Sequence, residues 1–106
     1  MRPGFAMHTI RLGPPWQVTV TDSGARHERK FGRPRTLDTY ERLWLVCEHV
    51  PGPAEVRVNG TTVGKSDTAG PFTADITSVL LPRNEVRFVV ASGAALGNVA
   101  LEVRSA

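Results

Sequence analysis

The sequence predicts an all-β fold, an antiparallel β-sandwich of about eight short strands that occupies residues 1–106 as a single domain. Apolar and polar residues alternate in one short segment after another, which is typical of strands with one buried face. Ten glycines and eight prolines punctuate the 106 residues, and so many turn-forming residues favour short strands over long helices. No repeat, low-complexity tract or linker divides the chain.

The alternating segments are residues 9–12, 16–21, 28–31, 41–50, 55–58, 61–64, 72–76, 85–90 and 99–104. In the second of them Trp16, Val18 and Val20 alternate with polar residues, so we expect these three side chains to face the core. The residues Asp22 to Gly24 have turn chemistry and lead towards the third segment. We expect residues 1–6 to form a loose tail, because Met7 could serve as an alternative start.

The segment ERLWLVCEHV, residues 41–50, is the strongest predicted strand. Leu43, Leu45 and Cys47 form one apolar face, and Trp44 and Val46 make the opposite face apolar as well. Two apolar faces are typical of a strand in the centre of a sheet, or of one that carries something packed on its outer side.

Two turns in the second half of the chain can be predicted from their chemistry. The pair Asn59 and Gly60 predicts a tight hairpin, because a type I′ turn needs a positive φ at both of its central residues. Further along, Asp75 and Thr77 can accept backbone N–H bonds just before residues 79–81. This pattern predicts one capped helical turn, which Pro82 stops.

A formal net charge of +3 raises the question of a nucleic-acid partner. The basic residues that gather in one short stretch are Arg26, Arg29, Lys30, Arg33 and Arg35. We do not expect nucleic-acid binding, because only Phe31 is interleaved among them for base stacking and Pro34 excludes a continuous helix.

The cellular compartment is predicted from the absence of a signal peptide, a membrane span and a disulfide framework in the sequence. No apolar run has the length of a signal peptide or a membrane span, so we expect no membrane partner. Cys47 is the single cysteine, which excludes an intrachain disulfide framework. We therefore expect a cytoplasmic protein.

One stretch of the chain, RKFGRP…ERLWLVCEHVPGPAEVRVNGTTVG…GPFTADITSVLLPRNEVRFVV, matches a known pattern. It resembles the sugar-binding domain at the N-terminus of glycoside hydrolase family 2 enzymes, the β-galactosidase and β-glucuronidase group, and the match covers roughly residues 28–103. The matching positions are Lys30, Phe31, Pro34, Leu43, Leu45, Val56, Val58, Asn59, Gly60, Gly64, Pro71, Phe72, Asp75, Ile76, Thr77 and Asn84. The resemblance implies a jelly-roll sandwich of the galactose-binding-like type.

The resemblance also limits what the chain is expected to do. Family 2 hydrolases carry their two catalytic glutamates in a separate barrel domain, and we expect a stand-alone sandwich without that barrel. The loop of residues 91–98, ASGAALGN, is shorter than the corresponding family loop and has neither Trp nor Asp. We expect the part of the domain that approaches the sugar to be reduced and the framework to be kept.

We expect no catalytic residue, no metal site and no cofactor. The three histidines show no paired metal-ligand spacing, and Asp67 and Asp75 do not supply the six or more oxygens that calcium requires. No nucleophile elbow, phosphate-binding glycine loop or redox motif occurs. Cys47 lies on an apolar strand face, where a thiol acts as a small hydrophobe. The sequence thus predicts a module that is not an enzyme.

If the domain binds carbohydrate, the resemblance implies a site in the loops at one end of the sandwich. These loops are residues 22–27, 65–70 and 91–98. The polar side chains that we expect to bond sugar hydroxyls are Asp22, His27, Asp67 and Asn98.

The alternative is a protein-interaction or scaffold module that has lost the sugar site. Trp44 points away from the face of Leu43 and Leu45, with Arg42 beside it. Trp44 could pack under the N-terminal segment, serve as a sugar platform or lie in an interface. Interface cores favour tryptophan, so Trp44 and Arg42 are candidate residues for a protein partner or a homo-oligomer.

Overall fold

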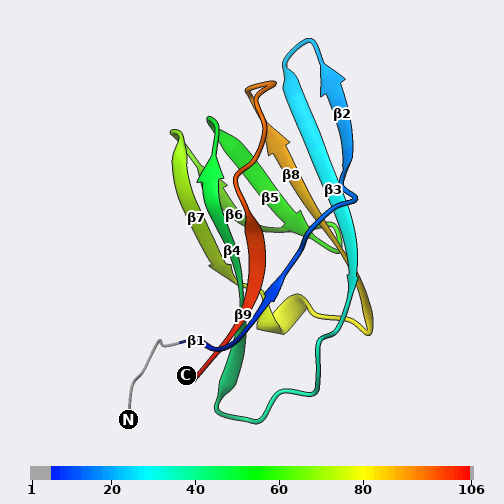
Figure 1. Ribbon diagram of the computed structural model, residues 1–106, viewed down its shortest axis with the longest axis vertical. Coiled ribbons are helices and arrows are strands. Elements are labelled where there is room, and N and C mark those ends of the chain that lie inside the picture. Colours follow the sequence, from blue (N-terminus) through cyan, green and yellow to red (C-terminus); the bar gives the residue numbers. More distant parts are fainter. Residues whose placement is uncertain (1–5, 106) are drawn as a thin grey trace.

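A computed structural model describes residues 6–105 of the chain, which contain nine β-strands and one short 3₁₀ turn (Figure 1). The elements are β1 (Ala6–Arg11), β2 (Gln17–Thr21), β3 (Gly24–Gly32), β4 (Glu41–Val50), β5 (Ala54–Val58), β6 (Thr61–Ser66), β7 (Gly70–Asp75), η1 (Thr77–Val79), β8 (Arg83–Val90) and β9 (Val99–Ser105). The tail expected at residues 1–6 falls outside the described residues, except for Ala6 at the start of β1.

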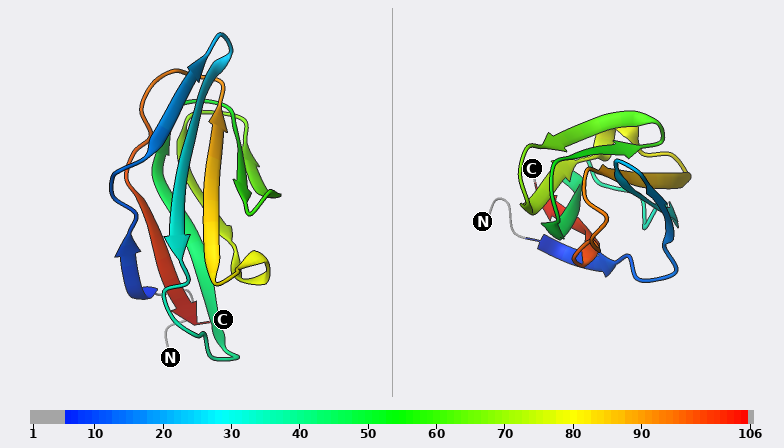
Figure 2. Two further views of the ribbon diagram at one scale, coloured as in Figure 1. Left: turned by 90° about the vertical axis from the view of Figure 1, so that its right-hand side faces the viewer. Right: turned by 90° about the horizontal axis from the view of Figure 1, so that it is seen from above.

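The strands form two antiparallel sheets that pack as two layers (Figure 2). One sheet has four strands in the order β1-β9-β4-β7, and the other has five in the order β2-β3-β8-β5-β6. Every strand pair in both sheets is antiparallel. The predicted β-sandwich is therefore confirmed, with nine strands in the described part where the sequence predicted about eight.

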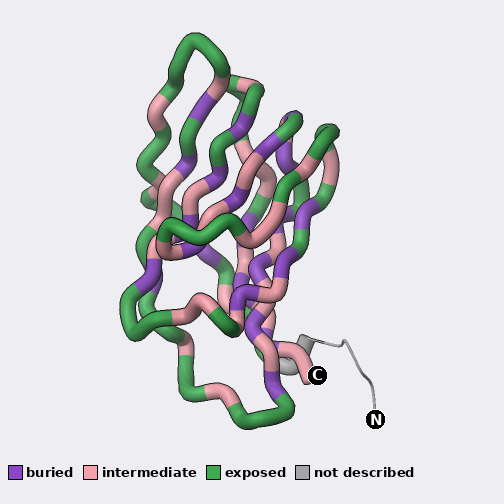
Figure 3. Tube along the Cα trace, turned by 180° about the vertical axis from the view of Figure 1, so that it is seen from behind, coloured by how far each residue is buried: buried purple, intermediate pink, exposed green. Residues whose placement is uncertain are grey.

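The core lies between the layers and follows the alternation of the sequence, as the buried positions along the strands show (Figure 3). β4 is central to its sheet and contributes Leu43, Leu45 and Cys47, all fully buried, as its two apolar faces predicted. Across from it, Val86 and Phe88 of β8 are fully buried as well. The Cys47 thiol donates to the backbone oxygen of His49, and burial raises its pKa.

The Asn59–Gly60 hairpin between β5 and β6 forms as predicted, with φ values of 54° and 82° at the two residues. The helical turn is found slightly earlier than expected, as the 3₁₀ turn η1 at Thr77–Val79. Its entry is fixed by Asp75, whose Oδ1 accepts the backbone N–H of Thr77 at 3.0 Å and the Thr77 hydroxyl at 2.7 Å. Thr77 in turn accepts the N–H of Leu43, which ties the turn to β4.

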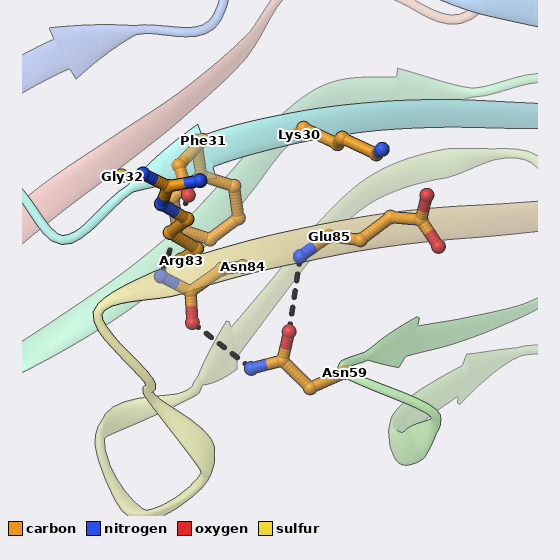
Figure 4. A pocket seen from close by; sticks show the side chains of 7 residues that line it. All are labelled: Lys30, Phe31, Gly32, Asn59, Arg83, Asn84 and Glu85. Atoms are coloured by element: carbon orange, nitrogen blue, oxygen red, sulfur yellow. Dashed lines mark hydrogen bonds between the residues drawn. The ribbon is translucent and has the colours of Figure 1, made fainter.

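Two asparagines connect this hairpin to the start of β8 (Figure 4). Asn59 Nδ2 donates to the carbonyl oxygen of Val79 and to Asn84 Oδ1, both at 2.9 Å, and Asn59 Oδ1 accepts the N–H of Glu85. Asn84 is buried and also accepts the N–H of Leu81 at 2.8 Å. The hydrogen bonds of these two amide groups therefore hold the β5–β6 hairpin, the η1 segment and the start of β8 together.

The β2–β3 hairpin projects beyond the other strands at the upper end of the molecule (Figure 1). Val18 and Val20 pair with His27 and Ala25 and so lie on the inner face, but they are 50% and 70% exposed. The prediction that these valines are buried is thus wrong, because β2 is an edge strand that the smaller four-stranded sheet does not cover. Trp16 does pack on the core, with its ring 6.1 Å from that of Phe88.

β3 also begins earlier than the alternating segment 28–31 indicated. It starts at Gly24, whose φ of 146° suits glycine. A Cβ there would lie 1.9 Å from the carbonyl oxygen of Val90, so glycine lets β3 approach β8 closely.

Replacement of Asn84 by alanine tests how much the asparagine pair contributes to stability. Asn84→Ala leaves the N–H of Leu81 and the amide of Asn59 without their partner, so we expect a loss of about 2–4 kcal/mol in the free energy of unfolding. Urea titration followed by tryptophan fluorescence measures this loss. Thr73→Ala, at an exposed position of β7, is the matched control and should shift the midpoint little.

Candidate functional site

The three loops that were expected to form a site all lie at the upper end of the sandwich, with the β2–β3 and β6–β7 turns at opposite sides of it (Figure 1). They connect β2 to β3, β6 to β7 and β8 to β9. Their predicted limits were too wide, because strand pairing continues into them. His27 lies within β3, and β6 extends to Ser66, so the loop ranges 22–27 and 65–70 are wrong.

The four candidate ligand residues do not converge on one point. Asp22 is exposed in the turn between β2 and β3, and Asp67 is exposed in the turn between β6 and β7. Asp67 borders a charged groove on the outer face of the five-stranded sheet, with Arg26 and Arg57 among its neighbours. His27 and Asn98, in contrast, line the same hollow on the inner side.

This hollow, which we call the end cleft, has a volume of about 370 Å³. It lies between the β2–β3 hairpin, the segment of residues 11–14 after β1, and the loop of residues 93–98. Its apolar walls are formed by Leu12, Pro14, Trp16, Val18 and Leu96. The end cleft exists because the inner face of β2 and β3 extends past the four-stranded sheet.

Asn98 and Arg11 form the polar rim of the end cleft. Arg11 Nη2 donates to Asn98 Oδ1 at 3.0 Å, and Asn98 Nδ2 donates to Glu48 Oε2 at 3.4 Å. The carbonyl oxygen of Asn98 also accepts the N–H of Glu48 at 2.9 Å, which fixes the end of the loop on β4. The Asn98 amide is thus oriented by its neighbours while its side chain stays exposed.

His27 supplies the buried polar group of the end cleft. It is only 5% exposed, and its Nε2 has no hydrogen-bond partner among the described residues. Desolvation disfavours the charged imidazolium, so burial lowers the pKa of His27 below its ordinary value of 6.5. A buried polar atom without a partner is uncommon and calls for a structural or functional explanation.

The two candidate interface residues lie on the outer face of the four-stranded sheet. Trp44 is half-buried, and the guanidinium of Arg104 lies over its ring, 4.7 Å from the ring centre. Arg42 Nε donates to Asp75 Oδ2 at 2.7 Å. Both side chains are therefore engaged by neighbours on their own sheet.

The basic stretch of residues 26–35 does not form one patch. Arg26 Nε is 3.2 Å from Glu28 Oε1 on the outer face, whereas Arg29 Nε donates to the carbonyl oxygen of Gly13 at 2.8 Å. Arg35 makes a bidentate pair with Glu41, at 3.0 and 2.7 Å. Strand alternation and internal bonds disperse this positive charge over several sides of the molecule.

Two members of the end cleft, Trp16 and Arg11, were not among the ligand residues predicted from the sequence. Trp16 was expected to be a core residue rather than a sugar platform, yet its indole N–H donates to the carbonyl oxygen of Leu12 at 3.0 Å and its ring borders the cleft. Arg11 belongs to no recognisable sequence motif. Its partner Asn98 lies 87 residues away in the sequence, so their contact could not be predicted. Only the pairing of β1 with β9 brings these two residues together. Within residues 6–105, no group of three metal-ligating side chains is found.

Several solved structures of similar fold are glycoside hydrolases. The chain aligns with Bifidobacterium dentium β-glucuronidase (TM-score 0.77, 13% identity, 99% of this chain and 31% of that one). It aligns equally with a β-glucuronidase of Dictyoglomus thermophilum (TM-score 0.77, 13% identity, 98% and 29%). A GH2 β-galacturonidase of Eisenbergiella tayi gives a TM-score of 0.68 at 15% identity (96% and 25%).

The chain therefore has the fold of the small N-terminal sandwich domain of GH2 glycoside hydrolases, as the resemblance implied. It spans less than a third of each of these three enzymes. No protein-family model and no curated protein matches the sequence. Among residues 6–105, no helix is both long enough and apolar enough to cross a membrane.

The buried imidazole of His27 should make the stability of the fold depend on pH. The unfolded chain binds a proton at His27 near pH 6.5, whereas the folded chain resists protonation there. The free energy of unfolding should therefore decrease as the pH falls from about 7.5 to about 5.5. In His27→Gln this decrease should be smaller, and urea titrations across the pH range measure it. His49→Gln, at an exposed position of β4, should keep the wild-type slope; equal slopes in all three proteins would contradict the assignment.

Proposed function

We propose that the chain is a non-catalytic β-sandwich module that binds carbohydrate in the end cleft. The observation that carries this proposal is the joining of His27 and Asn98, two of the expected ligand residues, with Trp16 around one hollow. The structurally similar enzymes support a sugar as the ligand, since one is described in complex with coumarin-3-O-glucuronide and another with galacturonate.

The size and chemistry of the end cleft suit a small sugar. Its volume of about 370 Å³ lies within the range of small-molecule sites, which are mostly apolar with a few oriented polar groups. The apolar edge of Trp16 and the side chain of Val18 can contact the C–H face of a sugar ring. The Asn98 amide and the Arg11 guanidinium can bond its hydroxyls.

The lining of the end cleft also supports a non-catalytic role. Glycoside hydrolysis normally uses two carboxyl groups that flank the scissile bond. The described residues that line the end cleft include no aspartate or glutamate. We therefore propose that binding, and not hydrolysis, takes place there.

A second candidate function is that of a protein-interaction module. It is favoured by the outer face of the four-stranded sheet, where Trp44, Val46 and Ala100 lie side by side on paired strands. The ion pair of Arg42 with Asp75 borders this apolar strip. Such a face, in which tryptophan and arginine lie beside small apolar side chains, has residue types that are enriched in protein interfaces.

Calorimetry with a panel of hexoses, hexuronic acids and their glycosides at millimolar concentration tests carbohydrate binding. We expect binding that weakens about ten-fold in Asn98→Ala, since one or two hydrogen bonds to hydroxyls are lost. Asp67→Ala removes one of the two candidate residues outside the end cleft and should leave the affinity unchanged. Absence of binding for every sugar, or equal effects of the two substitutions, would refute the proposal.

The second candidate is tested by capture of partners on immobilised protein. Trp44→Lys should abolish capture if the outer face is the interface, and the tryptophan fluorescence of the wild type should change on binding. His27→Gln, on the opposite sheet, is the control and should retain the partner. Capture that is indifferent to Trp44→Lys would count against this face.

A further inference from the structure

We infer that β2 is a dimerisation strand, which pairs antiparallel with β2 of a second copy of the chain and so joins two five-stranded sheets. β2 (Gln17–Thr21) is at one edge of its sheet, and Figure 1 shows no strand on its outer side. An edge strand presents unpaired backbone N–H and C=O groups, which are a template for another strand. This inference stands independently of carbohydrate binding.

The other three sheet edges within residues 6–105 all carry features that discourage pairing. β1 has a register shift between Ala6 and His8, β6 has one next to Gly64 together with Lys65, and β7 contains Pro71. Bulges, charges and prolines are the devices by which natural sheets block their edges. β2 has the sequence QVTVT and pairs with β3 in continuous register, so it has none of these devices.

The order of side chains in β2 fits a second copy of the same strand. With Thr19 opposite Thr19 of the second copy, Val18 lies opposite Val20 and Gln17 lies opposite Thr21. Opposed residues of an antiparallel pair share a face, so valines meet valines on the inner side and polar residues meet on the outer side. β2 contains no charged residue, so the pairing brings no like charges together. A two-fold interface requires such self-complementarity.

The exposed valines give this pairing a driving force. Val18 and Val20 are 50% and 70% exposed on an inner face that the four-stranded sheet leaves uncovered. Pairing would place the valines of one copy directly against those of the other and remove apolar surface from water. Thr19 and the valines are β-branched, a residue class that packs well across paired strands. The interface is small, so we expect a reversible dimer.

The dimer would also complete the wall of the end cleft. Val18 lines the end cleft from the β2 side. In the inferred register, Val20 of the second copy lies beside Val18 and extends this apolar wall. Each end cleft would therefore open next to the two-fold axis.

Sedimentation equilibrium of the full chain, from micromolar to millimolar concentration, tests the inference. We expect the average mass to rise from one copy towards two. Thr19→Lys places two lysines opposite each other on the axis and should weaken association about ten-fold or more. Thr73→Lys, on the outer face of β7, is the matched control and should associate like the wild type.

A cysteine at position 19 tests the register directly. Oxidised Thr19→Cys should form a disulfide-linked dimer, because opposed residues on the axis lie close enough for a disulfide. Thr73→Cys should remain monomeric under the same conditions, and the buried Cys47 should not react. A monomer at all concentrations, association that Thr19→Lys does not change, or equal cross-linking of both variants would overturn the inference. Circular dichroism establishes that each variant is folded.

Discussion

The unequal size of the two sheets is the constraint on which most features of this molecule depend. Four strands face five, so the inner face of the five-stranded sheet cannot be covered along its whole width. Strand alternation keeps Val18 and Val20 on that inner face through their pairing with β3, although half or more of each side chain is exposed there. The end cleft, the buried imidazole of His27 and the open edge at β2 all lie where the second layer ends.

The sequence predicted the parts of the fold that depend on local chemistry. The alternation in β4 and β8 and the Asn59–Gly60 turn follow from residue type, because period and turn geometry are local properties. The exposure of Val18 could not be predicted, since it depends on which strands lie opposite in the other sheet. Likewise, His27 and Asn98 share a cleft only because β3 and the end of the β8–β9 loop come together in space.

The basic residues at positions 26–35 are clustered in the sequence but dispersed in the folded molecule. The three basic residues of β3 lie on both of its faces, and the other two lie in the loop that follows β3. Most of the five bond a glutamate or a carbonyl oxygen. Arg35 illustrates this, since its bidentate pair with Glu41 closes the loop between β3 and β4. A cluster in sequence is therefore no guide to a surface patch when the segment is a strand.

The buried cysteine has a practical consequence. Cys47 is the only thiol in the chain, it is fully buried in the central strand β4, and burial raises its pKa. Its side chain faces the core between the two sheets, so a thiol reagent can reach it only when the sheets separate locally over β4. The rate at which the Cys47 sulfur is alkylated thus measures how often the two sheets open at β4. This measurement needs no introduced label, and motions of the projecting β2–β3 hairpin, which has no cysteine, do not affect it.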